Sequence, residues 1–246
     1  MKTRTVKYVG LILSLTALLS GCAGTAKSQT ADKTPDITTG GYTVNKNLSA
    51  AALPKDAQGA FDKALDGMTG ADYEPIVLIG TQTVSGTNYA ILCKVTPVIP
   101  DAESELDVVT IYEDLSGKAE ILSTEPFDLA EVTDTDQTYS KDDTMVGGFS
   151  TNTEFTAQET DDTVMKVFNQ AENADKSYHY AAELGTQSVS GTNYAFLALK
   201  EDNKDSDSAV WTVLTVYEDL DNKVSLSSAY ELDPGAYTTY GETEAD

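Results

Sequence analysis

The sequence has few of the residues on which most protein chemistry depends. Its 246 residues include two cysteines, one tryptophan and a single histidine, His179. One histidine cannot build a multi-histidine zinc site. Basic residues are also scarce, with 16 lysines and arginines against 40 aspartates and glutamates, which gives a net charge of −24. Because phosphate binding requires a basic face, this balance excludes nucleic acid as a general partner.

The composition is nevertheless that of a globular chain. Hydrophobic residues make up 40% of the sequence and aromatic residues 8%. This is enough apolar material to fill a core, so the acidic character does not indicate a disordered chain. The length permits one domain or two.

The N-terminal segment has the pattern of an export signal. Three basic residues within the first seven positions precede an apolar stretch, residues 8–19, which is too short to span a membrane comfortably. The stretch ends in Leu19-Ser20-Gly21-Cys22. This ending resembles the lipobox of bacterial lipoproteins, in which the cysteine becomes the lipidated N-terminus. The alternative is an ordinary secretory signal that ends near a cysteine.

The lipobox resemblance implies a bacterial envelope protein, exposed outside the cytoplasm and held to a membrane by a lipid on Cys22. Residues 1–21 are then the signal peptide, and the polar residues 22–39 are a flexible tether. Lipidation of Cys22 leaves Cys93 as the one free thiol, so no internal disulfide is expected. Cys93 lies in an apolar run and is expected to be a small buried hydrophobe. A catalytic thiolate would need an activating base, and His179 is the only histidine available.

An internal repeat organises the rest of the chain. Residues 80–90 recur as residues 185–195, with ten identities in eleven positions at an offset of 105. The sequence Tyr-Glu-Asp-Leu at 112–115 recurs at the same offset. The repeat predicts two tandem domains, at residues 40–129 and 147–236. An acidic linker, residues 130–146, lies between them, and an acidic tail, residues 237–246, follows the second.

Each domain is expected to combine one helix with several strands. Apolar residues at helical spacing follow Pro54 in the first domain, and a capping box of Thr156 and Glu159 precedes them in the second. These helical positions are Phe61, Ala64, Leu65 and Met68, and Val164, Val167, Phe168 and Ala171. Four strand-like runs follow each helix, at 76–84, 87–95, 106–113 and 118–123, and at 184–189, 192–199, 209–218 and 223–228. The prediction is an α+β fold in which each helix packs on a curved antiparallel sheet of four to five strands.

Both repeats contain the pattern Gln-x-Val-x-Gly, at 82–86 and 187–191, followed by Thr-Asn-Tyr. This pattern resembles the signature of the cystatins, and the continuation resembles the stefin branch of that family. Glycine pairs precede it at 40–41 and 147–148, and a second hairpin follows it. The resemblance covers about three quarters of the chain and implies two tandem cystatin-like domains. It also agrees with the lack of disulfides, since stefins have none.

The cystatin resemblance implies non-covalent inhibition of papain-like cysteine proteases. In that family the glycine pair and the two hairpins form a wedge that blocks the active-site cleft, so no catalytic residue, cofactor or metal is expected on this chain. The protease-binding positions that the resemblance implies are Gly40, Gly41, Gln82, Thr83, Val84, Ser85, Gly86, Leu115 and Ser116 in the first domain. In the second domain they are Gly147, Gly148, Gln187, Ser188, Val189, Ser190, Gly191, Leu220 and Asp221.

The sequence departs from the family pattern at the second hairpin. Many cystatins carry a Pro-Trp pair there, whereas these hairpins have Leu115-Ser116-Gly117 and Leu220-Asp221-Asn222. Trp211 lies several residues earlier, inside an expected strand, and is expected in the core. Ahead of the glycines, Met145-Val146 suits protease subsites better than Thr38-Thr39, so the second domain is expected to be the better inhibitor.

Two alternatives remain open at the level of sequence. The repeated pattern can simply build a tight hairpin, with glycine at the turn, asparagine making local hydrogen bonds and tyrosine packing. A protein of a different class, an adhesion or ligand-binding lipoprotein, can also use the cystatin fold as a scaffold.

Overall fold

The computed structural model describes residues 41–46, 53–133, 148–152, 162–171, 177–202 and 205–238. All of these residues belong to one compact unit, Ile37–Asp246. Several predicted features lie outside the described residues: the signal peptide and tether with Cys22, the glycines Gly40 and Gly147, the linker residues 134–146 with Met145-Val146, the capping box, and the tail residues 239–246.

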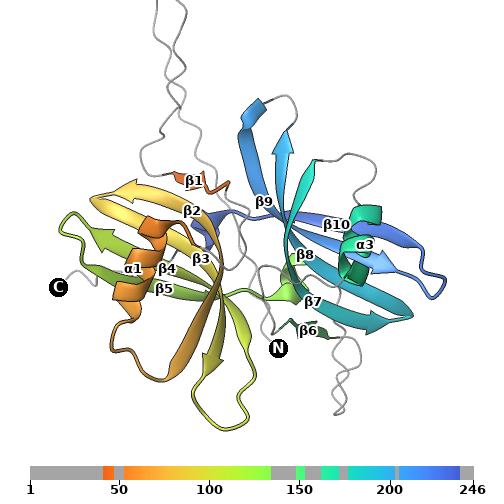
Figure 1. Ribbon diagram of the computed structural model, residues 1–246, viewed down its shortest axis with the longest axis horizontal. Coiled ribbons are helices and arrows are strands. Elements are labelled where there is room, and N and C mark those ends of the chain that lie inside the picture. The colour runs from red at the N-terminus through yellow and green to blue at the C-terminus, as the bar shows by residue number, and fades with distance from the viewer. Residues whose placement is uncertain are drawn as a thin grey trace, which may run out of the picture. The chain divides into compact units, whose positions relative to one another are not determined.

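The first repeat forms a five-stranded antiparallel sheet, sheet A, in the order β1-β2-β3-β4-β5. The strands are β1 (Tyr42–Val44), β2 (Ala71–Val84), β3 (Gly86–Pro97), β4 (Glu105–Asp114) and β5 (Ala119–Pro126). Helix α1 (Lys55–Leu65) lies across one face of this sheet (Figure 1).

The second repeat forms a sheet of the same kind, sheet B, in the order β10-β9-β8-β7-β6. Its strands are β6 (Phe149–Thr151), β7 (Tyr178–Val189), β8 (Gly191–Asp202), β9 (Asp205–Glu218) and β10 (Val224–Glu231), and helix α3 (Asp162–Ala171) packs on it (Figure 1). The prediction of a tandem α+β fold, with one helix on an antiparallel sheet in each repeat, is confirmed.

The first helix ends earlier than its apolar spacing predicts. It stops at Leu65, and Gly67 follows with a φ of 76°, so Met68 lies beyond the helix and is exposed. Phe61 is buried, Ala64 and Leu65 pack against the same cluster, and Ala57 and Ala60 extend this face toward the N-terminus. The prediction of a helix was therefore right, and the placement of Met68 on its apolar face was wrong.

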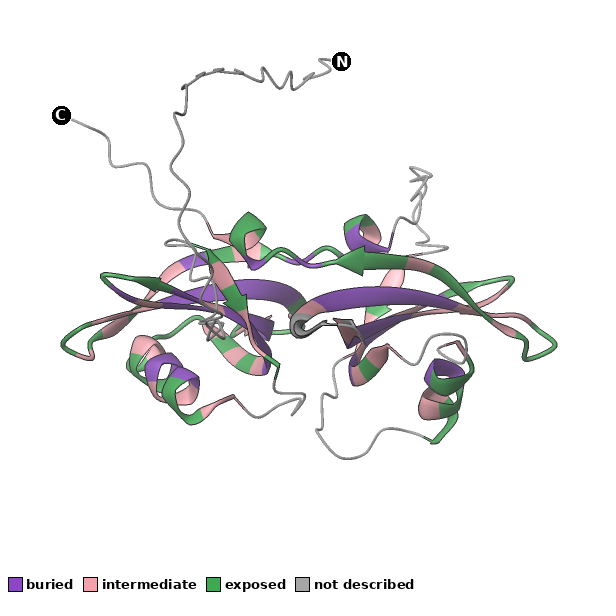
Figure 2. Ribbon diagram, turned by 90° about the horizontal axis from the view of Figure 1, so that it is seen from above, coloured by how far each residue is buried: buried purple, intermediate pink, exposed green. Residues whose placement is uncertain are grey.

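Both faces of each sheet are buried. Along β3, Ile91 and Cys93 point into a cluster with α1, whereas Ala90 and Leu92 point into a different cluster on the opposite face. Strand β8 follows the same rule, because successive side chains of a strand alternate between faces. Figure 2 shows the central strands as buried bands that become exposed toward the hairpin ends.

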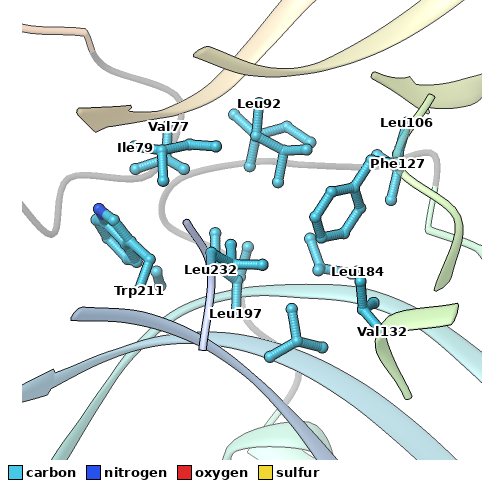
Figure 3. Close-up of a cluster of buried hydrophobic side chains, with 14 of the residues drawn as sticks. Val77, Ile79, Leu92, Leu106, Phe127, Val132, Leu184, Leu197, Trp211 and Leu232 are labelled. Carbon is cyan, nitrogen blue, oxygen red and sulfur yellow. The ribbon is translucent and has the colours of Figure 1, made fainter. Parts of the chain in front are cut away.

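The faces that lie opposite the helices share one core. Val77, Ile79 and Leu92 of sheet A belong to the same buried cluster as Leu197 and Trp211 of sheet B (Figure 3). Trp211 is completely buried there, as the sequence predicts. We call this cluster the shared core, and it joins the two repeats through apolar burial.

Each repeat also sends its last segment to the other sheet. After β5, the short helix α2 (Leu129–Val132) leads to Thr133, whose carbonyl oxygen accepts hydrogen bonds from Thr215 and Ser228 of sheet B (3.5 and 3.3 Å). After β10, the 3₁₀ turn η1 (Pro234–Tyr237) leads to Thr238, whose hydroxyl hydrogen-bonds the Tyr42 hydroxyl of sheet A (2.6 Å). Part of the expected linker and tail, residues 130–133 and 237–238, thus packs against the folded sheets.

Two glycines make room for these exchanged segments. A Cβ on Gly80 would lie 3.0 Å from the Thr43 carbonyl oxygen of β1 and 3.3 Å from Pro234 of η1. Gly185 has the matching position in sheet B, where a Cβ would meet Ser150 of β6 and Leu129 of α2. An added methyl group would be tightly packed at Gly80, and at Gly185 it would overlap the Ser150 carbonyl oxygen at 2.6 Å, so the close approach of β6 requires glycine at position 185.

The shared core predicts that the two repeats unfold together. Leu92→Ala in the first repeat should lower the free energy of unfolding by about 2 to 5 kcal/mol, because it leaves a cavity in a closely packed region. Trp211, the only tryptophan, reports on the second repeat by fluorescence during chemical denaturation. The fluorescence midpoint should shift with the far-UV circular dichroism midpoint. A Trp211 transition that Leu92→Ala leaves in place would show that the repeats unfold independently.

The burial of Tyr237 in η1 predicts that the stability of the folded state decreases at alkaline pH. Burial raises the pKa of Tyr237 to about 12 from its ordinary value of 10.0. The folded state therefore favours the neutral phenol, and its contribution to stability is fully present below pH 10 and is lost as the pH rises through 12. Tyr237→Phe keeps the ring against Phe127 (centroids 5.8 Å apart) and should reduce this alkaline loss. Denaturant midpoints of both proteins between pH 9 and 12 test this, and equal losses would contradict it.

Candidate functional site

The glutamine and asparagine of the repeated pattern bond to each other. Asn88 Nδ2 donates to Gln82 Oε1 at 2.7 Å, and Asn193 Nδ2 donates to Gln187 Oε1 at the same distance. Both glutamines are buried. Gln82 and Gln187, which the cystatin resemblance implies in protease binding, therefore hold the first hairpin together in this structure.

A tyrosine of the next strand holds the turn of each first hairpin. One residue, Ser85, connects β2 to β3, and its carbonyl oxygen accepts a hydrogen bond from the Tyr112 hydroxyl (2.7 Å). Tyr217 donates to the Ser190 carbonyl oxygen in the same way (2.5 Å). Gly86 has a φ of 145°, and a Cβ there would clash with the Glu113 carbonyl oxygen. The turn therefore requires glycine.

Three segments adjoin at this end of sheet A. Gly86 of the first hairpin pairs with Asp114, where the β4–β5 turn begins. On the other side, Tyr42 pairs with Gln82, so Gly41, which directly precedes β1, lies beside the same hairpin. Sheet B repeats the arrangement, with Phe149 opposite Gln187 and the β9–β10 turn next to the β7–β8 turn. The described parts of the glycine pairs and the two hairpins thus lie side by side in both repeats.

Apolar side chains are exposed on these adjoining turns. Leu115 is 88% exposed and Leu220 is 83% exposed, while Val84 and Val189 are 39% and 47% exposed. The neighbouring Thr83, Ser85 and Ser116 are exposed, as are Ser188, Ser190 and Asp221 of the second repeat. We call the exposed residues at the two turns the tip edge of each repeat, which leaves out Thr83 and Ser188 on the strands before the turns: Val84, Ser85, Leu115 and Ser116, and Val189, Ser190, Leu220 and Asp221.

Hydrogen bonds within the chain fix the β4–β5 turn behind Leu115. Asp114 Oδ1 accepts bonds from the Ser116 backbone N–H (2.8 Å), the Ser116 hydroxyl (2.7 Å) and the Lys118 backbone N–H (3.0 Å). These bonds, with that from the Ser116 side chain foremost, lower the pKa of Asp114. In the second repeat Asp219 Oδ1 accepts the backbone N–H groups of Asp221 and Lys223. Both leucines therefore project from ordered turns.

The two tip edges differ in charge. In the first repeat Lys63 of α1 contacts Glu113 Oε1 (2.7 Å) and also donates to the Gly117 carbonyl oxygen (2.9 Å). The second repeat has no counterpart of Lys63. Phe168 of α3 corresponds to Phe61 of α1, so the position that matches Lys63 is the exposed Gln170. Glu218 accepts a bond from Tyr194 (3.1 Å), and no lysine contacts it among the described residues. The second tip edge therefore carries more uncompensated negative charge.

The residues with reactive side chains lie away from the tip edges. Cys93 is fully buried in the cluster under α1, as predicted, and burial raises the pKa of its thiol. His179 lies on β7, where its Nε2 is 3.3 Å from Glu201 Oε2. The sequence predicted the tip residues but not the role of Lys63, because Lys63 is not repeated in the second domain. It also missed the roles of Tyr112 and Tyr217, although their shared offset of 105 was a usable signal.

The described part of the chain has neither a cluster of metal ligands nor a membrane-spanning helix. No group of three or more histidine, cysteine, aspartate or glutamate side chains there is arranged to hold a metal ion. None of the described helices has both the length and the apolar character needed to cross a bilayer. Comparisons with protein-family models and with curated protein sequences gave no match.

The buried Gln82–Asn88 pair predicts a folding role for the repeated pattern. Gln82→Ala leaves the Asn88 amide without this bond in a buried site, so the free energy of unfolding should fall by about 1 to 3 kcal/mol. The adjacent exposed substitution Thr83→Ala is the control and should change it by less than about 0.5 kcal/mol. Thermal unfolding of both variants measures this. Equal, small shifts would show that Gln82 contributes nothing to the hairpin.

Proposed function

We propose that the protein is a non-catalytic lipoprotein of the bacterial cell envelope that inhibits papain-like cysteine proteases by placing a tip edge in the active-site cleft. One observation carries this proposal. In both repeats an exposed valine and an exposed leucine project from adjoining, internally hydrogen-bonded turns, with the first strand beginning beside them.

The order of the turns favours insertion into a cleft. Binding costs less when the contact surface is already held in its bound conformation. The Tyr112 bond and the Asp114 bonds supply that order in the first repeat. The Ser85 turn is only one residue wide and uncharged, so it enters a narrow site with little loss of hydration. Blocking of this kind makes and breaks no covalent bond.

Burial of the exposed leucines supplies the binding energy. Leu115 and Leu220 are almost fully exposed in the free protein, and burying a leucine side chain contributes about 1.5 to 3 kcal/mol. The valines add a smaller contribution. The charges modulate this: Lys63 offsets Glu113 at the first tip edge, so that edge suits a neutral cleft, whereas the second edge suits a basic one.

The tether belongs to the same proposal. Lipidation of Cys22 would hold the folded unit near a membrane, and residues 22–39 could reach about 60 Å when extended. The excess of acidic residues would keep the unit away from an anionic membrane surface. Such a protein would intercept proteases that approach the cell envelope.

A second function is favoured by a different observation. The buried Gln82–Asn88 and Gln187–Asn193 pairs give the repeated pattern a folding role, which does not require a protease. The same tip edges then serve an adhesion or ligand-binding lipoprotein that uses the fold as a scaffold. Its ligand would contact the exposed valines and leucines, and a papain-like protease would keep its full activity in the presence of the protein.

The protease proposal is tested by residual papain activity. A soluble chain of residues 22–246 with Cys22→Ser should inhibit papain at micromolar concentration or below. Val84→Asp, Leu115→Asp, Val189→Asp and Leu220→Asp combined should weaken inhibition at least about a hundredfold, because each change introduces a charge that must be desolvated.

The control changes the same kind of residue at the other end of sheet A. Val98→Asp with Ile99→Asp alters two exposed apolar residues in the β3–β4 loop and should leave inhibition unchanged. A wild-type chain that does not inhibit papain would overturn the protease proposal. Inhibition that survives the four tip changes would assign it to another surface. Gly86→Trp is unsuitable because it would disrupt the turn itself.

A further inference from the structure

The two tip edges lie at opposite ends of one folded unit. Both repeats belong to the same compact unit, and the shared core joins their sheets directly. The β2–β3 and β4–β5 hairpins end at the left of Figure 1, whereas the β7–β8 and β9–β10 hairpins end at the right. Figure 2 also shows the hairpin ends at two opposite sides. The tip edges therefore face away from each other.

The strands carry each tip edge well beyond the shared core. On β3, six positions separate the core residue Leu92 from Gly86 at the turn, and Leu197 and Gly191 have the same spacing on β8. Because a strand rises about 3.3 Å per residue, each turn lies about 20 Å from the core and the two turns are about 40 Å apart. A globular partner of about 200 residues has a radius of gyration of about 16 Å. Two such partners can therefore approach from opposite sides without overlap.

The two ends differ in charge at one position of the helices. Lys63 of α1 lies 2.7 Å from Glu113 and neutralises it at the first tip edge. In α3 the corresponding residue is the exposed, uncharged Gln170. Within the described part of the chain, Glu218 of the second tip edge accordingly has no cationic neighbour in ion-pair range.

The other charges of the two turns are equivalent. Lys118 lies 3.3 Å from Glu120 in the first repeat, and Lys223 lies 4.0 Å from Asp221 in the second. The aspartate that begins each turn is common to both repeats and accepts backbone N–H groups in both. The local charge of the two ends therefore differs by that of the missing lysine.

We propose that the protein binds two partners at once, one at each tip edge, and that Lys63 and Gln170 set the charge that each edge accepts. This inference rests on the proposed function, because it takes the tip edges as the surfaces that contact a protease. The first edge then takes a partner whose cleft has a nearly neutral rim, and the second favours a partner with a basic rim. Charges at the rim of an interface act mainly on the association rate and its salt dependence.

The stoichiometry of papain binding tests the first part of the proposal. In isothermal titration calorimetry, the Cys22→Ser chain should bind about two papain molecules. Val84→Asp with Leu115→Asp disables the first edge, and Val189→Asp with Leu220→Asp disables the second. Each of these two variants should bind about one papain molecule, with the affinity of the edge that remains intact.

Exchange of the helix residues tests the second part by stopped-flow association with papain. In the chain with only the first edge intact, Lys63→Gln should steepen the salt dependence of the association rate. With only the second edge intact, Gln170→Lys should flatten it. The rate at low ionic strength should change about twofold to fivefold in each case, as expected for a partly exposed ion pair. The remaining charges of the chain act on each variant and its parent alike.

A matched control removes a lysine of the same kind away from the turns. Lys200 contacts Glu231 at 2.8 Å and lies nine positions along β8 from Gly191, which corresponds to about 30 Å. Charges at that distance are screened at 0.1 M salt, where the Debye length is about 10 Å. Lys200→Gln should therefore leave the salt dependence at the second edge unchanged.

The outcomes separate this inference from the proposed function. One papain molecule per intact chain, with both single-edge variants still binding, would show that the two sites exclude each other and would overturn the inference alone. Equal effects of Gln170→Lys and Lys200→Gln on the magnitude of the salt dependence would overturn the role of the helix position. A chain with both edges intact that does not bind papain would overturn the proposed function, and this inference with it. Circular dichroism of each variant checks that the fold is retained.

Discussion

Burial of both faces of each sheet is the constraint on which the rest of the structure depends. One face packs under a helix, and the opposite face can be buried only against the other repeat. A lone repeat would expose Val77, Ile79 and Leu92 to water, at a cost of about 25 cal/mol for each Å² of apolar surface. The tandem duplication is therefore a structural requirement, because each repeat supplies the other's missing layer. The exchanged segments α2 and η1 follow from it, since they cover the margins of the shared core with Leu129 and Val132 of α2 and Tyr237 of η1.

The architecture of each repeat could be predicted from the sequence. The packing of the two repeats around one shared core could not be derived from the same patterns. Alternation and turn residues locate the strands, and the offset of 105 shows that the plan is repeated. Helix spacing wrongly added Met68 to the apolar face of α1, because Met68 continues the helical period although the helix ends at Leu65, before Gly67. One signal of the shared core was present. Residues 89–93 and 195–199 are continuous apolar runs, which is typical of strands that are buried on both faces.

The candidate site was predicted as a set of residues but not as a set of roles. The sequence located both hairpin turns, and their exposed residues do adjoin the second hairpins. It placed Gln82 and Gln187 among the residues that contact a partner, because a pattern of letters does not distinguish an outward side chain from one paired within the hairpin. Each glutamine is paired within the hairpin because the asparagine of the neighbouring strand, Asn88 or Asn193, lies on the same face and bonds to it. Lys63 was beyond reach for a different reason, since its contact with Glu113 joins positions fifty residues apart.

Internal contacts account for most, but not all, of the identity between the two turns. The glutamine and asparagine bond to each other, the glycine fits against the next strand, and Tyr89 and Tyr194 bond to glutamates. The one difference in eleven positions is Thr83 against Ser188. Both side chains are exposed, so packing within the fold does not restrict the residue at this position. Val84 and Val189 are exposed as well, yet they are identical, and so are Leu115 and Leu220. Folding gives no reason for these apolar side chains to face water, and they are the residues that the proposed function would bury against a partner.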